Sequence, residues 1–124
     1  MKGAKPKLIV DNDAISKVPA PPSWMAKDAK AEWRRIMPAL VDRKILTNAD
    51  MGSVENYCVS IGRAREVEAL IQKDGIDPVL CRLQDKAVQT ARQLAAELGL
   101  TPVSRSRPSV REGVDDDDTS PLAV

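Results

Sequence analysis

The sequence predicts an all-α fold, in which an N-terminal helix packs on a long antiparallel helical hairpin, with disordered termini, in a ring-forming homo-oligomer. Two observations predict the hairpin: two stretches with apolar residues at helical spacing, and a short break between them. A third observation predicts the assembly. Among 124 residues only 2% are aromatic and Phe is absent, so the core is thin. A hairpin with so little core needs cover from further copies, or from the N-terminal helix in a small monomer; we expect the oligomer.

Composition divides the chain into three parts. Residues 1–22 hold four lysines, two aspartates and four prolines, which predict a disordered basic leader with a net charge of +2. Residues 23–110 form the predicted helical core and oligomerisation domain, with a net charge of +3. Residues 111–124, net −4, contain Asp115 to Asp118 and predict a disordered acidic tail. The leader is either a solvated segment or a basic arm that contacts DNA phosphates. The acidic tail either docks on a basic partner or folds back over the protein's own basic residues.

The first predicted helix begins near Trp24, with Ser23 as its N-cap. Pro38 falls late in this segment and is expected to kink or restart the helix. We expect both tryptophans to clamp the helix onto the hairpin. Its apolar face consists of Trp24, Ala29, Trp33, Ile36 and Met37, and its opposite face of Lys27, Lys30, Arg34 and Arg35 with Asp28 and Glu32 between them.

The hairpin begins at Thr47, a good N-cap, and Asp50 three residues later completes an acidic variant of the capping box. Gly75 suits the end of a helix and Pro78 the first turn of the next. Because the linker is so short, the two helices must run antiparallel with their apolar stripes facing. The first stripe is Met51, Val54, Cys58, Ile61, Ala64, Val67 and Ile71; the second is Leu80, Leu83, Ala87, Ala91, Leu94 and Leu98, closed by Gly99.

The residue inventory argues against catalysis. Without histidine the chain lacks Ser-His-Asp and Cys-His nucleophile pairs and His-containing zinc sites. Its six glycines are scattered singly, so no phosphate-binding glycine loop is present. Glu66 and Glu68 are two residues apart on a helix and point in different directions, which favours a solvated face over a metal-binding pair. We therefore expect no enzyme, no metal and no cofactor.

The cysteines and the hydropathy indicate the compartment. Cys58 and Cys81 lie at unequal distances from the turn at Gly75, so they should not meet, and reduced thiols are expected. No run of roughly 18 apolar residues predicts a membrane span, and no signal-peptide region follows the basic start. The protein is expected in the cytoplasm, with no membrane partner.

Several pieces occur in a characteristic order. They are Lys2-Gly3-Ala4-Lys5-Pro6-Lys7, the Pro-Ala-Pro-Pro stretch at 19–22, Ala29 to Trp33, Ile45-Leu46-Thr47 with Asp50, Tyr57-Cys58, and Leu98-Gly99-Leu100-Thr101-Pro102 followed by Ser104-Arg105-Ser106-Arg107. Together, over roughly residues 3 to 107, this order resembles the P27 family of phage terminase small subunits. The chain departs from the family at the hairpin turn, where members often have a longer glycine-containing excursion.

The resemblance implies a non-catalytic DNA-packaging component. Such subunits assemble as rings around helical hairpins, bind viral double-stranded DNA at the packaging site and deliver it to the large terminase subunit, which carries the ATPase and nuclease, in the bacterial host cytoplasm. In a ring every copy contributes its few lysines and arginines, so a modest positive charge per chain can still give tight DNA binding. The expected DNA contacts are Lys2, Lys5, Lys7, Arg34, Arg35, Arg105 and Arg107, and the expected oligomer contacts are Val54, Cys58, Ile61, Leu83, Ala87 and Leu94.

Other interpretations stay open. Arg34 and Arg35 are alternatively a solvated face that pairs with Glu32 and Asp28. A small helical DNA-binding transcriptional regulator is the alternative function, but the helix after Thr47 is not basic until Arg63, unlike a recognition helix. A purely structural coiled-coil adaptor is a third interpretation, and it would not need the basic leader or the arginines near residue 105.

Overall fold

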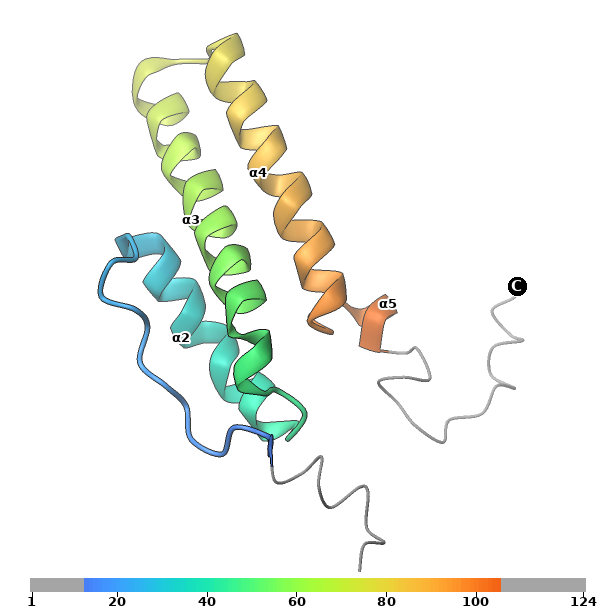
Figure 1. Ribbon diagram of the computed structural model, residues 1–124. Helices are drawn as coiled ribbons and strands as arrows, with labels where there is room; N and C mark the ends of the chain where they lie inside the picture. Colours follow the sequence, from blue (N-terminus) through green and yellow to red (C-terminus); the bar gives the residue numbers. More distant parts are fainter. Residues whose placement is uncertain (1–12, 106–124) are drawn as a thin grey trace, which may run out of the picture.

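The computed structural model describes residues 13–105. They form α2 (Lys27–Asp42), the 3-10 helix η1 (Asn48–Asp50), α3 (Met51–Asp74), α4 (Pro78–Glu97) and α5 (Pro102–Arg105). Figure 1 shows α2, α3 and α4 side by side, and α3 contacts both of the others. Over these residues the all-α prediction of a helix packed on a hairpin is confirmed. The described part of the chain contains no helix long and apolar enough to cross a membrane.

Local signals start and end the two hairpin helices as predicted. The backbone N–H of Thr47 donates to Asp50 Oδ2 at 2.9 Å, which closes the capping box ahead of α3. Gly75 follows α3 with φ at 98°, a conformation that a residue with a Cβ rarely adopts. Asp77 then caps α4 by accepting the backbone N–H of Val79 at 2.7 Å, and Pro78 occupies the first helical position.

The core lies between α2 and one half of the hairpin. The buried apolar residues are Met25, Ala29, Trp33, Ile36, Met37, Leu40, Val41, Leu46, Val54, Tyr57, Cys58 and Ala91. Helix α2 has 16 residues against 24 in α3 and 20 in α4, so it covers only part of their length. Figure 1 shows the turn end of the hairpin extending beyond α2. That half of the hairpin therefore has no third helix against it within residues 13–105.

The start of the first helix differs from the prediction. Helix α2 begins at Lys27, with Ala26 rather than Ser23 at the N-cap. A turn closed by the Met25 N–H and the Pro22 carbonyl, at 3.2 Å, precedes it. Because this turn directs Met25 into the core, Trp24 is left 63% exposed, and its predicted clamping role is wrong.

Pro38 neither ends nor restarts helix α2, which continues to Asp42. Proline removes one backbone hydrogen bond, the one to the carbonyl of Arg34. That residue is exposed, so water can satisfy its carbonyl group. The loss is tolerated there because the apolar residues on either side, Met37 and Leu40, hold the last turn against the core.

The segment before α2 lies along that helix instead of being free of the core. Ile15 N–H donates to the Leu46 carbonyl at 2.7 Å, and the Pro19 carbonyl accepts from the Trp33 indole N–H at 2.8 Å. Over residues 13–22 the structure therefore differs from the predicted disordered leader, because Pro19 accepts from the buried Trp33 and Ile15 donates to Leu46 beside the core. Residues 1–12 and the whole predicted acidic tail lie outside the described residues.

The end of α4 is tied back to α2. Gly99, with φ at 71°, ends the helix as predicted. The guanidinium of Arg43 donates from Nη1 to the Gly99 carbonyl at 2.7 Å, which satisfies an acceptor at the helix end. Just before and within α5, Thr101 and Ser104 exchange reciprocal hydrogen bonds of 3.2 and 3.1 Å, which satisfy backbone N–H groups at the start of this short helix.

Candidate functional site

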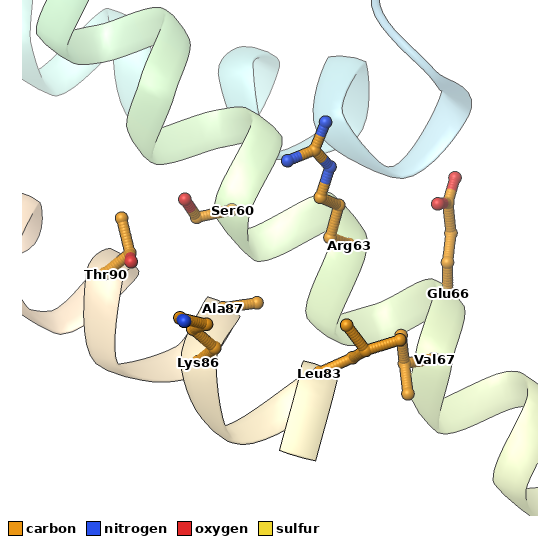
Figure 2. A pocket seen from close by; sticks show the side chains of 8 residues that line it. All are labelled: Ser60, Arg63, Glu66, Val67, Leu83, Lys86, Ala87 and Thr90. Atoms are coloured by element: carbon orange, nitrogen blue, oxygen red, sulfur yellow. The ribbon is translucent and has the colours of Figure 1, made fainter. Parts of the chain in front are cut away.

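A groove of about 420 Å³ runs between α3 and α4. Figure 2 shows Val67 of α3 and Leu83 of α4 approaching each other, whereas Arg63 and Glu66 project away from α4. Leu83 is 52% exposed although it lies on the predicted inner stripe. The residues that line the groove are Ser60, Arg63, Glu66, Val67, Leu83, Lys86, Ala87 and Thr90. The groove is thus apolar at its centre and bordered by charged side chains.

Apolar exposure continues from the groove to the turn. Leu70 is 44% exposed, Val79 53% and Ile76 84%. Single exposed apolar residues are ordinary, but a cluster of them is typical of an interaction surface. We call this cluster the hairpin surface; it consists of Val67, Leu70, Ile76, Val79, Leu83 and Ala87. It exists because α2 begins beside the middle of α3, where Ala29 lies against Gly62, and runs away from the turn (Figure 1).

The predicted oligomer contacts separate into two groups. Val54 and Cys58 are fully buried inside the protomer, because α2 covers that half of α3, so they cannot contact a second copy. Ile61 and Leu94 are partly buried against the same core. Leu83 is half exposed and Ala87 half-buried, and both line the groove, which opens to solvent. Of the six residues, the accessible assembly candidates are therefore the two groove residues.

A second groove lies next to the first and shares Arg63 and Glu66 with it. Its volume is about 200 Å³, and the exposed Trp24 is part of its wall. An exposed tryptophan beside apolar surface is a common feature of protein interfaces. Sequence patterns do not identify this position, because a tryptophan near a helix start is more often part of the core.

Glu32 departs most from the sequence-based prediction. It was predicted on the solvated face of α2, but its side chain is completely buried. The Tyr57 hydroxyl donates to Oε2 at 2.6 Å. Arg35 donates from Nε to Oε1 at 2.9 Å and from Nη2 to Oε2 at 2.6 Å, and Arg65 donates from Nη2 to Oε1 at 3.0 Å. Four donors thus satisfy the two carboxylate oxygens.

This arrangement fixes the protonation states around Glu32. Burial favours the neutral acid, but hydrogen bonds from Arg35 and Tyr57 and the charges of both arginines hold the pKa of Glu32 below its usual value. Burial and the hydrogen bond to Glu32 raise the pKa of Tyr57 to about 12. Burial chiefly, with the negative charge of Glu32, raises the pKa of Cys58 to about 12. At neutral pH the carboxylate is therefore ionised, and the phenol and thiol are neutral.

The cysteines are both free, as predicted. Cys58 is buried in the core beside the Glu32 cluster, whereas Cys81 is half-buried on α4. Among residues 13–105, no group of three or more His, Cys, Asp or Glu side chains is placed to hold a metal ion.

The predicted DNA contacts are only partly within the described residues. Arg34 is exposed on α2, and the side chain of Arg35 is 64% exposed but paired with Glu32. Arg35 thus pairs with Glu32, as in the alternative interpretation, but Glu32 is buried instead of lying on a solvated face. Arg105 is the last residue of α5, and Arg107 lies outside the described region, as do Lys2, Lys5 and Lys7. Arg65, which no sequence pattern singled out, joins Arg35 on Glu32.

Comparison with known proteins gives one match. A family model described as "Phage terminase, small subunit" matches residues 29–115, about 70% of the chain. The matched range begins in α2 and includes the whole hairpin. Neither the curated proteins nor the solved structures include a match to this chain.

Proposed function

The chain belongs to the phage terminase small-subunit family and so has a role in phage DNA packaging; on that premise we propose that it is a non-catalytic, ring-forming subunit. In this proposal it binds viral double-stranded DNA at the packaging site in the host cytoplasm. It then delivers the DNA to the large terminase subunit, which supplies ATP hydrolysis and cleavage.

The hairpin surface is the observation that carries the assembly. Its apolar side chains are half-buried or exposed in the protomer, and burying apolar area against another copy stabilises an assembly by about 25 cal/mol per Å². Each copy offers one such surface, and the second groove at Trp24 lies beside it on the same protomer. Two different surfaces on one chain allow head-to-tail contacts, which close into a ring when the rotation between copies permits.

Leu83→Asp should convert the assembly into smaller species. Leu83 is half exposed in the protomer, so the variant folds, but an interface would then have to bury an unpaired carboxylate. Native mass spectrometry at micromolar concentration should show a closed homo-oligomer larger than a tetramer for the wild type, and monomers or dimers for the variant.

Val88→Asp is the matched control. Val88 lies five residues along α4, is 44% exposed and falls on another flank of the helix by helical spacing, outside the groove. It should leave the mass distribution unchanged. A wild type that is a well-folded monomer or dimer would contradict the ring, and equal effects of both variants would contradict the assignment to the hairpin surface.

DNA binding should depend steeply on salt, because phosphate contacts release counterions. Deleting residues 1–12 removes Lys2, Lys5 and Lys7 while keeping Ile15 and Pro19, which contact the core. For every phosphate that the shortened protein no longer neutralises, the slope of log K against log salt should fall by about 0.9. Lys73→Gln, near the turn of the hairpin, should leave the slope as it is. An unchanged slope after the deletion would show that Lys2, Lys5 and Lys7 do not contact DNA phosphates.

A further inference from the structure

Two arginines from different helices meet on the buried carboxylate of Glu32. Arg35 lies one turn along α2 from Glu32, and Arg65 comes from α3, 33 residues away. The carboxylate is completely buried, whereas the arginine side chains are 64% and 47% exposed. The cluster thus has a buried negative anchor and an accessible positive surface, with two positive charges against one.

Each guanidinium keeps donors that Glu32 does not use. Arg35 gives Nε and Nη2 to the carboxylate, which leaves Nη1. Arg65 gives only one N–H, from Nη2, so one edge of its planar fork, either Nε with Nη2 or Nη1 with Nη2, keeps both of its N–H donors. Both side chains are about half exposed, so these remaining donors can be reached from solvent. A fork edge of this kind is the geometry that binds a phosphate group through two parallel hydrogen bonds.

Arg65 contributes less to the anchoring of Glu32 than the other donors do. Tyr57 and Arg35 already donate three hydrogen bonds to the carboxylate, two of them at 2.6 Å, while the Arg65 bond is the longest of the four. For Arg65 the contact instead holds the long side chain in one orientation. An arginine held in place before binding loses less rotamer freedom when it contacts a ligand.

We propose that Arg35 and Arg65, oriented by the buried Glu32, form a contact site for the phosphate backbone of double-stranded DNA on the α2–α3 face. This inference rests on the proposed DNA-binding function and assigns a site within the folded core to it. Arg65 is the principal phosphate ligand, through the edge of its fork that Glu32 leaves free, and Arg35 adds Nη1 and charge. Glu32 is a positioning residue. In an assembly the site is repeated in every copy, so that weak single contacts add along one DNA molecule.

Arg65→Gln tests the site in the full-length protein. Affinity for a double-stranded DNA fragment is measured over a range of salt concentrations, and a thermal melt verifies that each variant is folded. The variant should bind several-fold more weakly at low salt, with a slope of log K against log salt reduced by about one. Arg82→Gln removes the same charge from an exposed position on α4 that does not contact Glu32, and it should leave the slope within error of wild type.

Tyr57→Phe separates DNA contact from loosening of the core. It removes one hydrogen bond from Glu32 without removing any positive charge, so it should lower the melting temperature but keep the salt slope. A second measurement needs no variant: phenylglyoxal modification of the wild type, located by mass spectrometry, should show Arg65 protected by DNA and Arg82 unprotected.

The outcomes separate the site from the function. If the wild type binds DNA with a steep salt slope, but Arg65→Gln behaves like Arg82→Gln and Arg65 is not protected, the site is overturned and the DNA-binding function stands. If the wild type does not bind double-stranded DNA even at low salt, the proposed function itself fails.

Discussion

Glu32→Gln is expected to lower the free energy of unfolding by about 1.5–3 kcal/mol, the range for losing a hydrogen bond to a charged group. The effect should stay below the roughly 3–5 kcal/mol measured for fully buried ion pairs, because the Arg35 and Arg65 side chains are about half exposed and can turn to water. In a domain of this size each kcal/mol lowers the melting temperature by about 4–8 °C. Thermal and urea melts of the variant measure the loss.

We also expect the stability effect of Glu32→Gln to depend on pH. The folded-state pKa of Glu32 is lowered, so the unfolded chain binds its proton more tightly than the folded protein. Its contribution is therefore present above the unfolded value of about 4.3 and is lost as the pH falls from there through the folded pKa. The stability difference between wild type and Glu32→Gln should be constant near neutral pH and shrink in acid. A difference that grows in acid would contradict an ionised Glu32.

Glu68→Gln is the control for these measurements. Glu68 also has a lowered pKa, through hydrogen bonds from Gln84 and Gln72, but it lies at the surface of the hairpin. Exposed contacts of this kind contribute little to stability. If Glu68→Gln lowers the free energy of unfolding as much as Glu32→Gln does, burial is not the cause of the large effect at Glu32.

Gly62→Ala is expected to destabilise the protein by about 1–3 kcal/mol, although alanine is the better helix former. A Cβ at Gly62 would lie 2.8 Å from the backbone N and 3.0 Å from the Cβ of Ala29, closer than atoms pack. Because the contact is with the backbone of α2, no side-chain rotation relieves it. The two helices must separate, and the apolar contacts around Trp33 loosen with them.

Gly52→Ala is the matched control on the same helix. Nothing lies within 4 Å of a Cβ at that position, so only helix propensity acts, and the variant should be stabilised by up to about 1 kcal/mol. Opposite signs for the two substitutions in urea melts would isolate the close approach of α2 and α3. If Gly62→Ala is also stabilising, the close packing at Ala29 is not a constraint on the fold.

The sequence alone predicted what is determined locally. The Thr47–Asp50 capping box, the Gly75 break, Pro78 and the closing Gly99 all act through the backbone of nearby residues, and each occurs where the pattern placed it. The periodicity of the apolar residues likewise predicted two antiparallel helices. These features could be read from the chain because each depends on interactions spanning only a few residues.

The stripes did not show how far each residue is buried. Val54 and Leu83 both belong to the predicted inner stripes, yet Val54 is fully buried and Leu83 is half exposed. The difference comes from α2, which is shorter than the hairpin and covers one half of it. Periodicity gives the direction in which a side chain points, but the lengths and offsets of the packed helices decide what covers it.

Glu32 shows the same limit in the candidate site. Its place among charged residues of α2 predicts a solvated carboxylate, and local spacing identified only its partner Arg35. Tyr57 and Arg65 follow 25 and 33 residues later, and they reach Glu32 because α3 packs against α2 at Gly62. Local sequence thus determined the helices and their ends, whereas the tertiary structure alone decided that a carboxylate is buried and that two arginines meet on it, because burying that charge requires donors from both helices at once.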